Sequence, residues 1–215
     1  MHKVVGVFLS LVASSVFAQT NRIDTSSAEY QRAIEASKQR RGETTFWRAD
    51  DIGVSLGYDE RWREVSPSQS QTRMVIEWQA RSSQGLMATC FVQAGDTSGI
   101  AKLSPVQIQQ GASRIADSIL SVDRMRDPNA RMVRWSLATQ DGHPVVYTER
   151  DVSVQNLERR LEMRIYTIAT AWRGSEIQVS CASEVPRKIP EAAQMVEFPM
   201  KAVLGSVTFR RLPPG

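Results

Sequence analysis

The chain has few of the residues from which metal sites and catalytic triads are built. Its 215 residues include two cysteines, Cys90 and Cys181, and of its two histidines only His143 lies beyond the first eighteen residues. A zinc site needs three or four nitrogen, sulfur or oxygen ligands, so neither a metal nor another cofactor is expected. A phosphate-binding glycine loop and a Gly-x-Ser-x-Gly elbow are also missing. These absences argue against an enzyme, and we predict no catalytic, cofactor-binding or metal-binding residue.

Long apolar runs are missing as well, and the longest lies at the start of the chain. It is about 13 residues long, follows Lys3 and ends at Val16, whereas a membrane span needs about 20 residues. Val16 and Ala18 occupy the −3 and −1 positions of a small-residue cleavage site, which is typical of a signal peptide. We therefore expect a signal peptide over residues 1–18, cleaved between Ala18 and Gln19, and no transmembrane segment. A buried N-terminal helix is the alternative.

A strong charge of one sign is absent too. The formal net charge is +4, and 41% of the residues are hydrophobic, which is ordinary for a globular protein with a core. Acidic residues lie close to most of the arginine doublets, so a nucleic-acid partner is not expected. We divide the chain into a signal peptide (1–18), an N-terminal lead-in and helix (19–45), and a single α+β sandwich domain (46–211).

The two cysteines bear on the compartment. In an exported protein an even pair favours a disulfide, so we expect Cys90 and Cys181 to be bonded on neighbouring strands. Two separate buried thiols are the alternative. No Asn-x-Ser/Thr acceptor for glycosylation occurs. Together with the short signal peptide, this favours a periplasmic protein.

Hydrophobic periodicity predicts a mixture of helices and strands. Helical spacing predicts helices over residues 26–42, 104–122 and 190–203, the second with Ser104 as its cap and Pro105 at the first helical position, and the third broken at Pro199. Alternating apolar residues joined by turn signals predict strands over residues 52–58, 74–80, 86–92, 133–137, 144–150, 158–172, 177–181 and 207–210. Strands joined by short turns form antiparallel sheets. We therefore expect an α+β fold, mainly an antiparallel sheet covered by helices on both faces (an αβα sandwich).

From residue 52 onward the pattern resembles the family of PsbP, the extrinsic protein of photosystem II, and its bacterial exported relatives. The likeness covers about three-quarters of the chain and excludes the helix at 26–42. It rests on Leu56, Tyr58 and Trp62, on Ser104–Pro105, on Gly142–His143–Pro144–Val145, on the strand pair around Gly174, and on Ser206–Val207–Thr208–Phe209. The resemblance implies an αβα sandwich and, for the bacterial relatives, mostly non-enzymatic or uncharacterised roles. The photosynthetic role does not carry over, because no metal-binding or docking residue of that branch can be matched.

Several polar residues are candidates for chemistry. His143 could act as a catalytic base positioned by Asp141, but a histidine in an Asp-Gly-His-Pro turn normally faces water. Asp50 and Asp51 form an adjacent carboxylate pair, but adjacent strand residues point to opposite faces. Asp123, Asp127 and Asn129 suggest a calcium loop, but the glycine and the distal glutamate of that loop are missing.

Aromatic residues offer the other candidate site. Trp78 and Trp135 share the apolar faces of their predicted strands, so we expect both in the core. Trp47 and Trp62 lie near turns and could line a surface groove.

Two functions remain at this point. The first is an exported, non-catalytic periplasmic module that binds an unknown protein or an envelope component. It is favoured by the lack of a catalytic constellation and by the resemblance. The alternative is a periplasmic hydrolase using His143 and nearby acids, which would require His143 to face a pocket with a serine and a carboxylate in reach.

Overall fold

The computed structural model describes residues 44–79, 87–96, 99–155, 160–184 and 190–210. The predicted signal peptide, its cleavage point between Ala18 and Gln19, and the helix expected at 26–42 lie outside the described residues. Within the described residues, no helix is both long enough and apolar enough to span a membrane.

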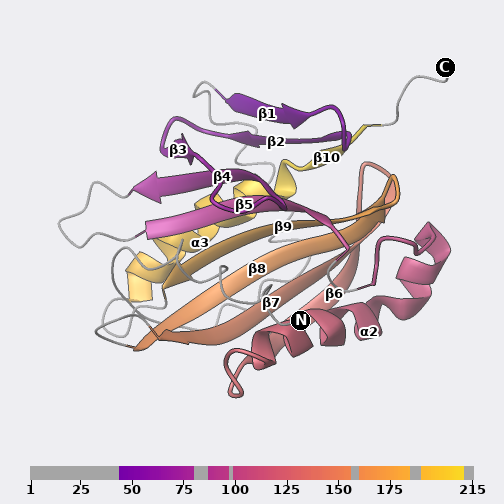
Figure 1. Ribbon diagram of the computed structural model, residues 1–215. Helices are drawn as coiled ribbons and strands as arrows, with labels where there is room; N and C mark the ends of the chain where they lie inside the picture. The colour runs from indigo at the N-terminus through magenta and orange to yellow at the C-terminus, as the bar shows by residue number, and fades with distance from the viewer. Residues whose placement is uncertain (1–43, 80–86, 97–98, 156–159, 185–189, 211–215) are drawn as a thin grey trace.

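A seven-stranded antiparallel sheet dominates the structure (Figure 1). Its strand order is β3-β4-β5-β9-β8-β7-β6, so β3 and β6 form the two edges. Two-residue turns join β6 to β7 and β8 to β9, as the turn signals at Gly142 and Gly174 predicted. The strands are β3 (Trp62–Val65), β4 (Thr72–Gln79), β5 (Met87–Gly95), β6 (Arg131–Gln140), β7 (His143–Gln155), β8 (Arg160–Trp172) and β9 (Ser175–Glu184).

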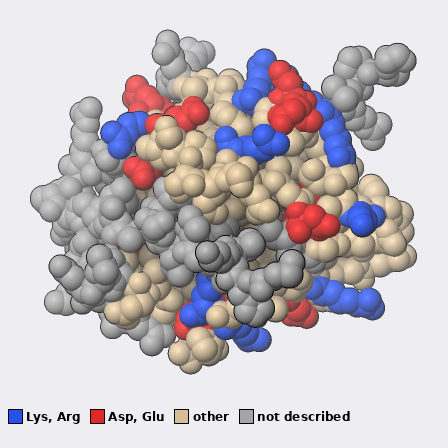
Figure 2. Space-filling model, in the orientation of Figure 1, with Lys and Arg blue, Asp and Glu red and all other residues tan. Residues whose placement is uncertain are grey.

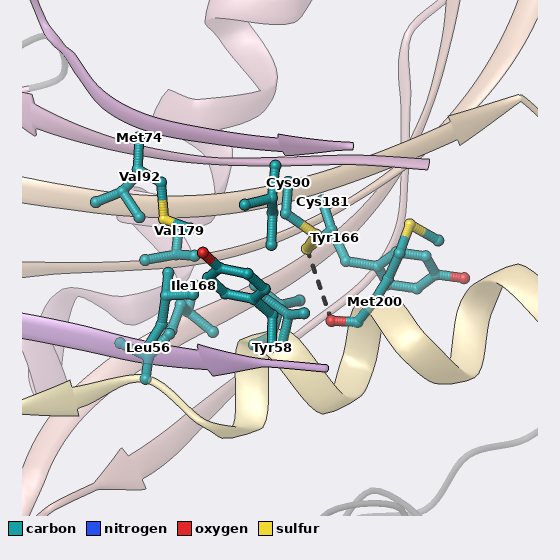
Figure 3. Close-up of a cluster of buried hydrophobic side chains, with 14 of the residues drawn as sticks. Leu56, Tyr58, Met74, Cys90, Val92, Tyr166, Ile168, Val179, Cys181 and Met200 are labelled. Carbon is teal, nitrogen blue, oxygen red and sulfur yellow. Dashed lines mark hydrogen bonds between the residues drawn. A yellow bond between two sulfur atoms is a disulfide. The ribbon is translucent and has the colours of Figure 1, made fainter. Parts of the chain in front are cut away.

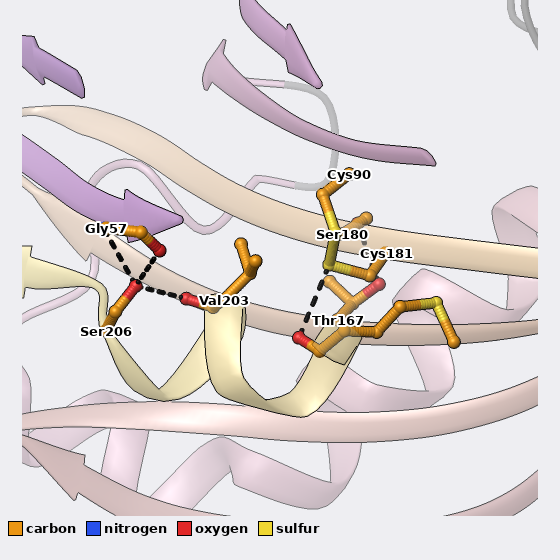
Figure 4. Close-up of a disulfide and its surroundings, with 8 residues drawn as sticks. Gly57, Cys90, Thr167, Ser180, Cys181, Val203 and Ser206 are labelled. Atoms are coloured by element: carbon orange, nitrogen blue, oxygen red, sulfur yellow. Dashed lines mark hydrogen bonds between the residues drawn. A yellow bond between two sulfur atoms is a disulfide. The ribbon is translucent and has the colours of Figure 1, made fainter. Parts of the chain in front are cut away.

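A second, three-stranded sheet has the order β1-β2-β10. It consists of β1 (Thr45–Ala49), β2 (Val54–Tyr58) and the short β10 (Thr208–Phe209). The hydroxyl of Ser206 holds it to the end of α3 (Pro190–Gly205), because it accepts from the Gly57 amide at 2.8 Å and lies 2.7 Å from the Val203 carbonyl oxygen (Figure 4).

The two described helices lie on opposite faces of the main sheet. The α2 helix (Pro105–Arg124) begins with the predicted cap: Gln107 N donates to Ser104 Oγ, and the Gln107 side chain accepts from Ser104 N in return. It packs on β6, β7 and β8, whereas α3 packs on β2, β5, β8 and β9. The α3 helix continues through Pro199, where a break was predicted.

The larger core lies between the main sheet, the small sheet and α3. Leu56 and Tyr58 of β2 face Val92 and Val179 of the main sheet, and Met200 of α3 closes the cluster (Figure 3). A smaller core forms under α2, where the buried apolar side chains of the helix pack on Val146, Ala169 and Ala171.

The mainly antiparallel α+β fold is thus confirmed. A sandwich of helical layers describes it less well, because a second sheet shares one face with α3 and α2 packs on only three strands.

Candidate interaction site

Cys90 and Cys181 are directly opposite each other on β5 and β9 and form a disulfide with a Cα–Cα distance of 4.0 Å. Both residues are almost fully buried in the larger core. The sulfur of Cys181 lies 3.6 Å from the carbonyl oxygen of Met200, so the disulfide rests against α3 (Figures 3 and 4). The bond and the neighbouring strands agree with the prediction.

His143 lies at the start of β7, after a two-residue turn whose central residues, Asp141 and Gly142, both have positive φ. Its Nε2 is 2.9 Å from the Ala171 carbonyl oxygen and 3.0 Å from Thr170 Oγ1. A carbonyl oxygen only accepts, so Nε2 carries the proton in the neutral ring. In a serine triad Nε2 must instead accept the hydroxyl proton.

The His143 ring also packs against two aromatic side chains. Its centroid is 4.9 Å from that of Trp172 and 5.5 Å from that of Phe209. The Asp141 carboxylate accepts a hydrogen bond from the Phe209 amide at 3.0 Å. The expectation that His143 faces water is wrong: the ring is half-buried and joins the β8 end of the main sheet to β10 of the small sheet.

The candidate carboxylates Asp51 and Asp127 have structural partners. The Asp51 side chain pairs with Arg73 at 3.1 Å, and both are exposed. Asp127 is buried and accepts from the Asn129 amide at 3.1 Å and the Ser153 amide at 2.7 Å, which fastens the loop after α2 to β7. Among the residues that the structure describes, no three His, Cys, Asp or Glu side chains lie together as metal ligands would.

Asp123 is bonded to Arg150 of β7 beneath α2. Burial raises the pKa of the Asp123 carboxyl and lowers that of the Arg150 guanidinium. Arg150 also donates to Thr167 Oγ1 at 2.7 Å, and that hydroxyl is 2.8 Å from Ser180 Oγ. This network of side chains runs across β7, β8 and β9 and fixes α2 to the sheet through a buried ion pair.

The opposite face of β6, β7 and β8 carries a partly buried ion-pair cluster, in which Arg131 is exposed and Glu149 is buried. Arg131 pairs with Asp151 at 2.6 Å, and Arg134 pairs with Glu149 at 3.2 Å. Arg164 bonds both of these carboxylates, and although burial lowers its pKa, the hydrogen bond and charge of Asp151 raise it overall. Acidic and basic side chains also alternate on the face shown in Figure 2. Balanced pairs of this kind do not form an anion-binding surface.

The tryptophans are arranged differently from the prediction. Trp62 is a core residue, 6% exposed, with its ring 6.4 Å from that of Trp78. Trp47 is half-buried and packs against the same core. These two side chains therefore contribute to the core where a surface groove was expected.

Trp135, predicted to be buried, is exposed. It lies on β6 between Val133 and Leu137, and the three side chains keep 43% (Val133), 42% (Trp135) and 43% (Leu137) of their surface accessible. Their alternation predicts a core face, but β6 is the edge strand of the described sheet, and no described element covers these three side chains fully. We call Val133, Trp135 and Leu137 the β6 stripe. Exposed apolar groups gathered on one element are typical of contact surfaces.

No protein-family model and no curated protein sequence matches this chain. Solved structures that it resembles include cyanobacterial PsbP from Synechocystis sp. PCC 6803, with 11% identity and a TM-score of 0.49 over 79% of this chain and 94% of that one. LpqN of Mycobacterium tuberculosis, described as involved in cell envelope biogenesis, has 13% identity and a TM-score of 0.46 over 87% and 98%. PA94 of Pseudomonas aeruginosa, a protein of unknown function, has 14% identity and a TM-score of 0.43 over 80% and 100%. Cyanobacterial PsbP, from the family that the sequence pattern resembles, is thus among these solved structures, and a fold does not define a function.

Proposed function

We propose that this chain is an exported, non-catalytic periplasmic module that binds a protein or another envelope component through the open edge of its main sheet. The observation that carries the proposal is the β6 stripe. Three large apolar side chains stand exposed in a row on an edge strand, where a partner can reach both the side chains and the backbone. Binding by addition of a strand to such an edge is a common mode of protein recognition.

Two further features support the location and the lack of catalysis. A buried disulfide fits an oxidising compartment, which agrees with the signal peptide expected at residues 1–18. The Nε2 atom of His143 donates to a carbonyl oxygen and its ring packs between aromatic side chains, so this residue serves the joint between the two sheets. The hydrolase alternative would need that nitrogen as a base.

The test is a comparative pull-down from envelope extract with the mature protein immobilised. Trp135→Ala and Leu137→Ser should lose the captured component. The control Phe46→Ser removes an even more exposed apolar residue from β1, the edge of the small sheet, and should capture as the wild type does. Equal capture by all four proteins would exclude the β6 edge as the binding surface.

A parallel experiment addresses export and chemistry. Protein purified from the envelope should have an intact mass that starts at Gln19, and a mass retaining residues 1–18 would contradict export. His143→Ala should leave capture unchanged. If a folded His143→Ala protein lost its function, the hydrolase would become the leading candidate.

A further inference from the structure

The outer side of β6 presents an open row of backbone hydrogen-bonding groups. No described strand pairs with that side, and β6 contains no proline, glycine or lysine. Of the features that usually protect an edge, β6 has a β-bulge at one end, between Met132 and Arg134. Its two arginines are held in ion pairs with carboxylates of β7. The strand lies at the end of the sheet in Figure 1, beyond β7.

The turn before β7 determines which residues of β6 face outward. Positive φ at both Asp141 and Gly142 makes this a two-residue type I′ turn, which closes on a hydrogen-bonded pair, here Gln140 and His143. Hydrogen-bonded positions alternate along an antiparallel pair. Ser136 and Ala138 therefore bond to β7, while the amides and carbonyls of Trp135 and Leu137 point to the open edge.

We propose that a second copy of this chain occupies this edge, with the two β6 strands antiparallel and a two-fold axis at Trp135. This deepens the proposed function and rests on it, since the same β6 stripe forms the contact. The main sheets of two copies would then join into one continuous sheet. Two-fold contacts of this kind are self-complementary, because the same patch serves both copies.

The order of the side chains favours this register. When Trp135 lies opposite Trp135 of the second copy, Val133 lies opposite Leu137 and Leu137 opposite Val133. Every member of the β6 stripe then meets another member, and directly opposite apolar side chains stabilise a strand pair. Val133 lies in the β-bulge between Met132 and Arg134, so the paired stretch is centred on Trp135 and ends at Val133.

The charges are compatible with the same register. Arg134 lies opposite Ser136 of the second copy, so no two like charges face each other within the paired stretch. Ser136 is exposed and projects on the sheet face that carries Arg134. The contact is a short one, so we expect a dimer that forms and dissociates reversibly, at the weak end of specific interfaces.

The experiment is sedimentation of the purified mature protein over roughly 1 to 300 µM, a range that brackets weak specific association. The wild-type protein should convert from monomer to dimer within this concentration range. Ser136→Arg places like charges opposite each other and should weaken dimerisation several-fold, whereas Ser136→Glu faces Arg134 and should retain or strengthen it. Leu137→Lys should abolish dimerisation, and Phe46→Lys, on the edge of the small sheet, should not.

Amide hydrogen exchange identifies the contact. At high concentration the amides of Trp135 and Leu137 should exchange more slowly, while those of Ser136 and Ala138, already bonded to β7, should not change. A protein that stays monomeric, or a dimer without this alternating protection, would overturn the inference. If such a monomer still captured an envelope component through Trp135, the proposed function would stand and only the second copy would be excluded. A β6-dependent dimer that captures nothing would support this inference and contradict the wider function.

Discussion

The ion pair between Asp123 of α2 and Arg150 of β7 is the place where a single polar substitution should destabilise the fold most. The Arg150 side chain is 5% exposed and that of Asp123 14%. Removing the carboxylate leaves a buried guanidinium whose charge has lost its partner. The remaining hydrogen bond to Thr167 satisfies only one of its donors.

The magnitude follows from this asymmetry. Breaking a buried ion pair by removing one partner costs about 3–5 kcal/mol, whereas replacing both partners by apolar residues is often neutral or stabilising. For a domain of this size 1 kcal/mol shifts the melting temperature by about 2–4 °C. We therefore expect Asp123→Leu to lower it by roughly 6 to 20 °C. The double variant Asp123→Leu/Arg150→Met should recover most of that loss.

Thermal and urea unfolding, both followed by tryptophan fluorescence, give the melting temperature and the free energy of unfolding of each variant. The pair Asp59–Arg61 supplies the control. That pair is far more exposed, so Asp59→Leu should cost less than about 1 kcal/mol. If Asp123→Leu destabilised the protein no more than Asp59→Leu does, the view of Asp123–Arg150 as a buried anchor would be wrong. A double variant less stable than Asp123→Leu alone would also refute it.

Three other predictions concern stability. Replacing Cys90 and Cys181 together by alanine should lower the free energy of unfolding by about 4–5 kcal/mol, since the disulfide closes a loop of 91 residues; an unchanged urea midpoint would contradict this. Trp78→Ala should cost about 3–5 kcal/mol because it empties a core position, whereas Trp135→Ala should cost less than about 1 kcal/mol; similar melting temperatures would exclude the difference in burial. Burial, followed by the charges of two nearby glutamates, raises the pKa of Tyr166 above its ordinary value of 10.0. The unfolded chain therefore loses this proton first as the pH rises through about 10, and stability falls above that pH. Tyr166→Phe should therefore lose less stability than the wild type between about pH 8 and pH 10.5. If melting curves showed the same loss of stability in both proteins, Tyr166 would not be the group responsible for it.

Local signals in the sequence predicted many of the elements. The start of α2 follows from Ser104 and Pro105, because a cap and an N-terminal proline act within one turn. The hairpin at Gly142 follows from its turn residues in the same way. The strands β1 and β3 were missed because four or five residues give too short an alternation. Pro199 fits within α3 although a proline in that position predicted a break.

The side-chain environments were harder to predict, because they depend on parts of the chain distant in sequence. His143 has the local sequence of an exposed turn, and only the return of β10 places Phe209 against its ring. Trp62 follows a turn, and only the pairing of β3 with β4 stacks it on Trp78. In both cases the side chain that buries the residue comes from a strand that only the tertiary fold brings beside it.

The exposure of Trp135 has the same kind of cause, yet the sequence contained the information needed to infer it. The strands β6, β7, β8 and β9 form a meander, each hydrogen-bonded to the next. The bond between Cys90 and Cys181 requires β9 to lie beside β5. If β9 joins the meander to β5, the other end of the meander is β6, which meets no further strand among the described residues and forms the edge of the sheet. The disulfide predicted from cysteine count and compartment therefore implies an open β6 edge. Alternation alone could not reveal this, because an apolar face is buried only where another element covers it.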